Sequence, residues 1–120
     1  MTIGSPTSRV YVDHAGIYNF QFSAQLNKGS ASKADVNIWY RKNGADVANS
    51  ATKVSLQGSS AAAVAAWNFV VQMAANDYFE LVWSTTDTGC QIVAAAAASP
   101  VPAIPSVILT VTDNISTMGV

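Results

Sequence analysis

The residues of this chain that could do acid–base or nucleophilic chemistry are few and scattered. The single histidine, His14, follows Asp13, and an imidazole beside a carboxylate is two thirds of a Ser-His-Asp triad. Adjacent residues of a strand point to opposite faces, however, and the chain has no G-x-S-x-G nucleophile elbow. We therefore predict that His14 is a solvated turn residue, that no residue is catalytic and that the chain is not an enzyme.

Potential metal ligands are equally dispersed. Cys90 is the only cysteine, which excludes an intramolecular disulfide and a cysteine-based metal framework, and we expect it to be a small buried or half-buried apolar residue. The carboxylates occur singly, in different turns and strands, at Asp35, Asp46, Asp77, Glu80, Asp87 and Asp113. None belongs to a D-x-D-x-D-G calcium loop. The pattern predicts neither a metal site nor a cofactor.

Composition and charge argue against nucleic acid and membranes as partners. Phosphate binding depends on clustered Lys and Arg, whereas the six such residues here are spread along the chain and the net charge is -1. The glycine-containing segment NKGSASK lacks the P-loop pattern. Three prolines interrupt the most apolar stretch, IVAAAAASPVPAIPSVIL, and MTIGSPTSRV lacks the features of a secretory signal. We expect a soluble protein made in a cytoplasm without export.

The low charge also predicts assembly. A chain of 120 residues fits one domain, and with 50% hydrophobic and only 11% charged residues it should fold with an unusually uncharged surface. Such a surface stays soluble through Ser, Thr, Asn and Gln, or part of it is covered in an oligomer. We favour the oligomer.

Hydrophobic periodicity predicts an all-β fold. HAGIYNFQFSAQLN alternates with period two and places one set of residues on a core face, namely Tyr18, Phe20, Phe22, Ala24 and Leu26. Four later segments alternate in the same way, with core faces at Val36, Ile38 and Tyr40; at Trp67, Phe69, Val71 and Met73; at Phe79, Leu81 and Trp83; and at Val107, Leu109 and Val111. Closely spaced turn residues separate them. Many short antiparallel strands indicate a two-sheet sandwich or jelly roll.

Two alanine runs, residues 61–66 and 94–98, leave an alternative open because alanine has the highest helix propensity. Both runs continue into or out of strand-like segments and are shorter than an isolated helix normally requires. We therefore favour strands for both. Alanines in a strand let a second backbone or sheet approach closely.

Several segments in order carry a resemblance to a known family. VDHAGIYNFQFSAQL resembles the strand-turn-strand motif of the globular head of complement component one q and its tumour-necrosis-factor-like relatives. Together with VNIWYRKNGADVANS, AAWNFVVQMAANDYFELVWS and PSVILTVT, the chain is similar to the form of that domain found in bacteriophage virion proteins. The similarity spans about residues 9–112.

The resemblance implies a jelly roll of two antiparallel sheets that assembles as a homotrimer around a threefold axis. Family domains usually have one or two strands before the segment that matches RVYVDHAG, and here only MTIGSPTS precedes it. Either the first strand is missing or these residues form a shortened one, and an open edge invites pairing with another chain. We divide the chain into an N-terminal arm (1–8), the jelly roll (9–114) and a C-terminal tail (115–120).

Four apolar residues on predicted outer faces suggest the subunit contact. They are Trp39, Tyr78, Val82 and Ile108, on the strands VNIWYR, YFELVWS and SVILTVT. The resemblance implies that these strands share the sheet that lines the trimer axis. Our hypothesis is that the four residues form the trimer interface.

These expectations lead to a non-enzymatic structural protein of a phage virion. The first candidate is a trimeric decoration or cement protein on the capsid surface, with the major capsid protein or another virion protein as partner and MTIGSPTS as its attachment arm. The alternative is the head of a tail or head fibre that binds a host-surface receptor or glycan. A fibre head usually follows a shaft, and this chain begins at Met1 close to the fold, which favours decoration.

Overall fold

The computed structural model describes residues 2–3, 8–29 and 33–113, and within these residues the chain is all-β with two antiparallel sheets. The β4–β8 sheet has the order β1-β2-β8-β4-β5, and β6 also pairs with β4. The β3–β7 sheet has the order β10-β3-β7, and β9 also pairs with β3. The strands are β1 (Thr2–Ile3), β2 (Val10–Tyr11), β3 (Gly16–Lys28), β4 (Ala34–Lys42), β5 (Ala45–Asp46), β6 (Thr52–Leu56), β7 (Ala62–Met73), β8 (Tyr78–Thr85), β9 (Cys90–Ile92) and β10 (Val107–Thr112).

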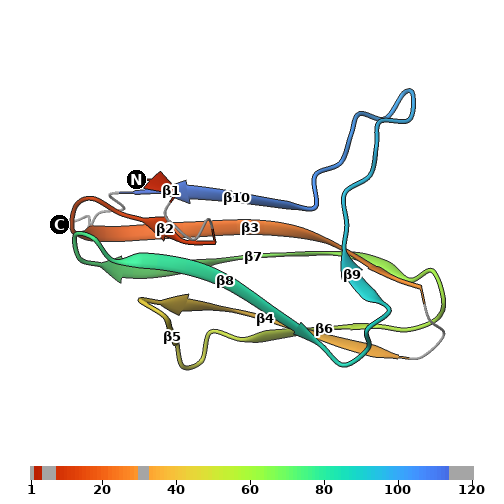
Figure 1. Cartoon of the computed structure of the whole chain (residues 1–120), viewed down its shortest axis with the longest axis horizontal. Helices are drawn as coiled ribbons and strands as arrows, with labels where there is room; N and C mark the ends of the chain where they lie inside the picture. Colours follow the sequence, from red (N-terminus) through yellow and green to blue (C-terminus); the bar gives the residue numbers. More distant parts are fainter. Residues whose placement is uncertain (1, 4–7, 30–32, 114–120) are drawn as a thin grey trace.

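The two sheets pack face to face as a β-sandwich (Figure 1), which confirms the predicted fold class at this level. The core face predicted for β3 is buried throughout, from Tyr18 to Leu26. Phe20 on β3 stacks on Phe79 of β8, with ring centroids 3.9 Å apart. Aromatic side chains from both sheets therefore fill the space between them.

The turn between β4 and β5 follows directly from its sequence. Asn43 and Gly44 both have positive φ, 53° and 84°, which is the backbone of the two-residue type I′ turn that Asn-Gly favours. Asn43 also joins this turn to the start of β8, because its N–H donates to the Tyr78 carbonyl over 3.0 Å and its Oδ1 accepts from the Tyr78 N–H over 3.0 Å.

The two alanine runs have different structures. The first is a strand as predicted, since residues 62–66 begin β7 and pair with β3. For residues 94–98 the strand prediction is wrong: they are extended but belong to neither sheet, and make only isolated bridges, Ala95 with Ile104 and Ala98 with Val101. Pro100, Pro102 and Pro105 have no N–H to donate, so the returning limb cannot complete a ladder.

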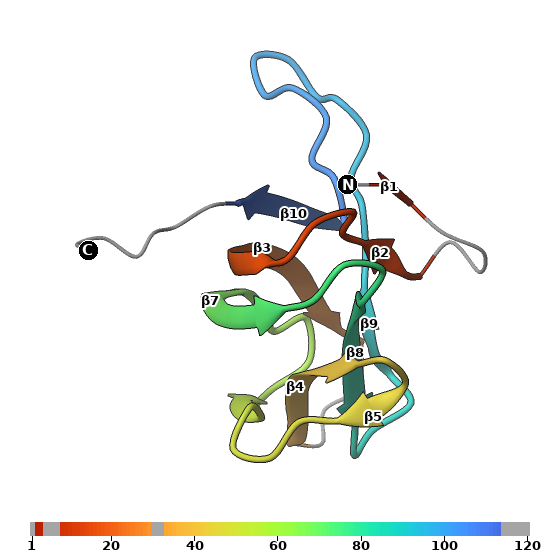
Figure 2. The ribbon, with the colours of Figure 1, turned by 90° about the vertical axis from the view of Figure 1, so that its left-hand side faces the viewer.

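Residues 93–106 interrupt a single edge strand. β9 pairs with β3 up to Ile92, opposite Leu26, and β10 resumes at Val107, opposite Ala24. Gln25 lies between these pairs and binds both ends of the excursion: its carbonyl accepts from the Val93 N–H over 3.0 Å, and its N–H donates to the Ser106 carbonyl over 2.8 Å. We call residues 93–106 the projecting arm; it stands clear of both sheets on the β10 side (Figures 1 and 2).

The beginning of the fold contains a short strand. β1 pairs with β2, and β2 pairs with β8, so these residues extend the edge of the β4–β8 sheet. Residues 1 and 4–7 of the expected N-terminal arm, and the whole expected C-terminal tail 115–120, lie outside the described residues.

The three strands expected to share one sheet do not do so. β4 and β8 are neighbours, as expected, but β10 pairs with β3 in the opposite sheet. The physical reason is the course of the chain. Because β9 pairs with the free edge of β3, the chain is already at that edge, and β10 pairs along the same edge after the projecting arm. Ile108 is therefore on the other side of the sandwich from Trp39.

Candidate assembly surfaces

The outer face of the β4–β8 sheet brings Trp39 and Val82 together. They are directly opposite each other in the β4–β8 pairing and both are half-buried. The Trp39 indole N–H donates to Asp46 Oδ1 over 2.8 Å, and Arg41 Nε donates to the same oxygen over 2.6 Å. These hydrogen bonds from Arg41 and then Trp39 lower the pKa of the Asp46 carboxyl. An ion pair thus borders the apolar pair.

Tyr78 lies further along β8, under a cationic side chain. Its ring centroid is 5.2 Å from that of Tyr11 and 4.3 Å from the Arg9 guanidinium carbon, a cation–π distance. Glu80, between Tyr78 and Val82 on the same face, accepts a hydrogen bond from Ser8 Oγ over 2.6 Å. The β4–β8 outer face is therefore aromatic and charged.

Ile108 belongs to a very different surface, the outer face of the β3–β7 sheet. The strand registers place sixteen side chains on this face. None is charged, and we call it the charge-free face: Ile17, Asn19, Gln21, Ser23, Gln25, Asn27, Ala62, Val64, Ala66, Asn68, Val70, Gln72, Gln91, Ile108, Thr110 and Thr112.

Exposed aliphatic side chains lie among amides and hydroxyls on the charge-free face. Val64, Val70 and Ile108 are 58%, 62% and 51% exposed. A shallow hollow of about 340 Å³ lies beside Ile108, between Gln21 and Ala66. The prediction from sequence missed Val64 and Val70, although they alternate with the core residues of β7 and could have been found by that signal.

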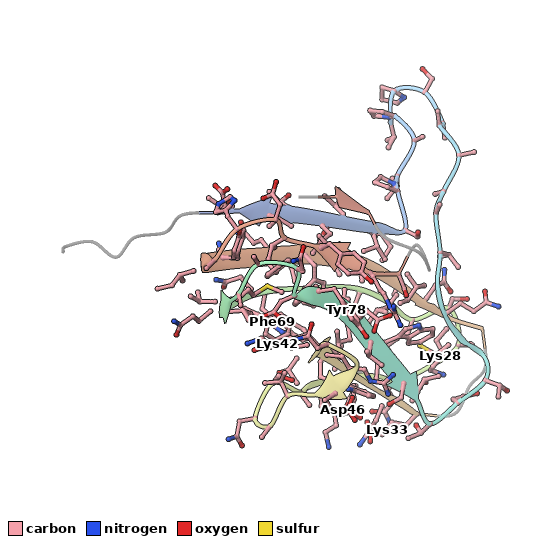
Figure 3. All side chains as sticks on the ribbon, turned by 60° about the vertical axis from the view of Figure 1, so that its left-hand side comes forward. Lys28, Lys33, Lys42, Asp46, Phe69 and Tyr78 are labelled. Carbon is pink, nitrogen blue, oxygen red and sulfur yellow. The ribbon has the colours of Figure 1, made fainter. Side chains whose placement is uncertain are left out.

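Like the charge-free face, the projecting arm carries no charged residue. Residues 88–112 contain no charged residue, and residues 94–105 are all exposed, with Val101 at 50% and Ile104 at 36%. In Figure 3 the labelled Lys33, Lys42 and Asp46 lie on the sandwich, away from the arm. Since water disfavours contiguous exposed apolar surface, such surfaces on folded domains usually mark contact sites.

An apolar groove opens at the root of the arm, between the two sheets. Its volume is about 230 Å³. Uncharged side chains from both sheets line it, chiefly Ala24, Ile38, Leu81, Trp83, Ile92 and Val107. Trp83 and Val107 remain 37% and 39% exposed although they point to the core side of their strands. The sandwich is incompletely filled at this end.

Of the residues considered for acid–base chemistry, His14 lies close to two carboxylates, Asp13 and Asp113. His14 and Asp13 are in a bend before β3, so the expectation that they point apart is wrong: His14 Nδ1 lies 2.8 Å from Asp13 Oδ1. His14 Nε2 lies 3.4 Å from Asp113 Oδ2, and these side chains are at least half exposed. The hydrogen bond to His14 lowers the pKa of Asp13.

Other potential ligands remain separate. Cys90 is buried, with 3% exposed, as predicted. In the part of the chain that the structure describes, His, Cys, Asp and Glu form no group of three placed to hold a metal ion. The described residues also include no helix that is long and apolar enough to cross a membrane.

Comparison with known proteins adds no family to this geometry. A scan against protein-family models found no match, and a search of curated proteins found none either. The surfaces described above are therefore the basis for a functional proposal.

Proposed function

We propose that the chain is a non-enzymatic structural module that assembles with copies of itself, as a trimeric jelly roll. One observation carries this proposal: all thirteen charged residues lie off the charge-free face and off the projecting arm. A sheet face that stays in water usually carries charges, which also oppose unwanted pairing of sheets. A face of amides, hydroxyls, alanines and aliphatic residues suits contact with another protein.

The division of the four hypothetical interface residues between two sheets fits a cyclic trimer. In a ring, each subunit contacts the next through two different surfaces, one on each partner. Ile108, with Val64 and Val70, would belong to one surface. Trp39, Tyr78 and Val82 would belong to the other, where the rings of Trp39 and Tyr78 offer anchors for apolar contact.

Within this assembly proposal, the specific role is decoration of a phage capsid surface, with the major capsid protein or another virion protein as partner. The sequence resemblance to phage virion domains supports it. Low net charge supports it as well, because closely packed copies with high net charge would repel each other.

The test has two stages. Light scattering with size-exclusion chromatography should give the mass of a trimer, and a monomer at micromolar concentration would overturn the assembly proposal. Purified trimers added to expanded capsids should bind at or near threefold positions in a cryo-EM map and raise the temperature at which the capsids break. Capsids that bind none, or immunogold labelling confined to a tail tip, would overturn the decoration role.

The hollow on the charge-free face supports one alternative, the head of a fibre that binds a glycan. Gln21 and Ser23 line it, and amide and hydroxyl groups are suitable hydrogen-bond partners for sugar hydroxyls. Binding of the trimer to defined glycans on an array, lost on Gln21→Ala but kept with Gln57→Ala, would favour this alternative over decoration.

A further inference from the structure

The projecting arm is an apolar ribbon whose two limbs are joined by backbone hydrogen bonds. Gln25 binds both of its ends, as described above. Further out, Ala95 and Ile104 exchange two backbone hydrogen bonds of 2.9 Å, and Ala98 and Val101 exchange two of 2.9 and 2.6 Å. The two limbs therefore support each other, and each can reach roughly 20 Å in extended conformation.

The groove at the arm's root has the complementary character. It is apolar, uncharged and bounded by Ile92 and Val107, which flank the arm. Its volume of about 230 Å³ exceeds that of a cavity of about 150 Å³ known to admit a benzene molecule. It can therefore receive aliphatic side chains such as those of Val101 and Ile104.

We propose that the arm of one copy inserts its apolar tip into the root groove of a second copy, and that this arm exchange joins the subunits of the assembly. This inference rests on the self-assembly proposed above and adds the contact that joins the copies. Each copy carries both the projecting arm and the root groove, so a head-to-tail arrangement can close into a ring in which every arm is received.

A second copy is a better occupant than the arm of the same chain. The arm leaves the sandwich beyond the edge strand and stands away from the sheets in both ribbon views (Figures 1 and 2). To reach its own groove it would have to fold back at its root, where the bonds of Gln25 to Val93 and Ser106 hold both limbs. Insertion into a neighbour keeps these bonds.

The interrupted strand offers a sharp experiment. Ile92 pairs with Leu26 and Val107 with Ala24, so only one residue is needed opposite Gln25. Replacing residues 93–106 by a single threonine should join β9 and β10 into one continuous edge strand. We expect this variant to keep the circular dichroism spectrum and a cooperative melt of the parent, while its mass by light scattering falls to that of a monomer.

Point variants keep the test independent of the deletion. Val101→Asp and Ile104→Asp each place a charge on the arm, and each should weaken association at least roughly tenfold, because a buried aliphatic side chain is replaced by a charge. Gln57→Asp is the matched control, since residue 57 is exposed outside the arm and groove, and it should leave association unchanged.

Engineered disulfides identify the occupant. In a Cys90→Ala background, a batch with Ile104→Cys and a batch with Trp83→Cys are mixed, dissociated, reassociated and oxidised. A mixed covalent dimer on a non-reducing gel supports exchange between copies. In the double variant, an internal disulfide within a monomer would overturn it.

Failure of this inference is distinguishable from failure of the proposed function. A trimer that survives replacement of residues 93–106 would overturn arm exchange and leave assembly intact. Monomers from that replacement, together with parent trimers that bind no capsid, would support arm exchange and overturn only the decoration role.

Discussion

The rings of Phe20 and Phe79 stack in parallel across the interior, with centroids 3.9 Å apart and 2° between their planes. Phe20 belongs to β3 and Phe79 to β8, so this contact joins the central strands of the two sheets. Both residues are almost completely buried, at 0% and 1% exposed. An aromatic pair thus connects the two sheets across the core.

Truncation of this pair should cost much of the stability. Phe79→Ala removes the ring and leaves a cavity, and we expect a loss of about 3–5 kcal/mol in the free energy of unfolding. Urea denaturation followed by circular dichroism measures it. Val70→Ala is the control, because Val70 is 62% exposed and should cost under about 0.5 kcal/mol in the monomer. Equal losses for the two variants would contradict the structure.

Alanine substitutions at Gly44 and Gly58 can distinguish the cost of backbone strain from that of a steric contact. Gly44 and Gly58 both have positive φ, so alanine at either should cost about 1–2 kcal/mol. A Cβ at Gly44 would also meet Tyr78 Oη at 3.0 Å, whereas one at Gly58 meets nothing within 4 Å. Thermal melts should therefore rank Gly44→Ala below Gly58→Ala. Adding Tyr78→Phe to Gly44→Ala should recover the difference; no recovery would rule out the hydroxyl as its cause.

Asp77 should make stability depend on pH in the acid range. Its carboxylate accepts from the Ala74 N–H over 2.8 Å and from Asn43 Nδ2 over 2.9 Å, and it lies 3.8 Å from Lys42 Nζ. These partners, the Ala74 N–H first, lower the pKa of Asp77 below its usual value. Because the unfolded chain then binds the proton more tightly, this stabilisation is complete above the unfolded pKa of about 4 and is lost as pH falls through the folded pKa.

The measurement compares unfolding free energies of the parent and Asp77→Asn between pH 7 and pH 2. The parent should lose more stability than Asp77→Asn over this range. Ser55→Ala applies the same comparison to a second carboxylate, Asp35. Ser55 Oγ donates to Asp35 Oδ1 over 2.7 Å, and this hydrogen bond is the main cause of the lowered pKa of Asp35. Parallel pH profiles for the parent and Asp77→Asn would contradict the assignment.

Polar or charged substitutions on the proposed contact surfaces should weaken the trimer without unfolding the subunit. Val70→Glu places a carboxylate at the most exposed large aliphatic residue of the charge-free face, and we expect monomers by light scattering with an unchanged circular dichroism spectrum. Trp39→Ser tests the other sheet and should also weaken the trimer. A trimer that persists in Trp39→Ser would remove the β4–β8 outer face from the interface, and one that persists in Val70→Glu would remove the charge-free face.

The sequence was sufficient to predict which side chains of each predicted strand face the core side of the sandwich, although Trp83 and Val107 stay partly exposed there. Period-two alternation is a local property: once a segment such as residues 16–28 is extended, Phe20 and Phe22 must share a face and Gln21 must take the other. The turn at Asn43 and Gly44 can also be predicted from local sequence. Asn-Gly favours a two-residue type I′ turn, because both residues readily adopt the positive φ that this turn requires.

The tertiary structure alone decided which strands share a sheet and where the alanine run 94–98 lies. Alternation does not encode a strand's neighbour, so Ile108 and Trp39 could be assigned to one sheet until the pairing of β10 with β3 separated them. Nor does it encode that Gln25 binds Val93 and Ser106, which turns residues 93–106 into an arm. These choices depend on hydrogen bonds between residues distant in the chain, and such contacts exist only after the sheets have formed.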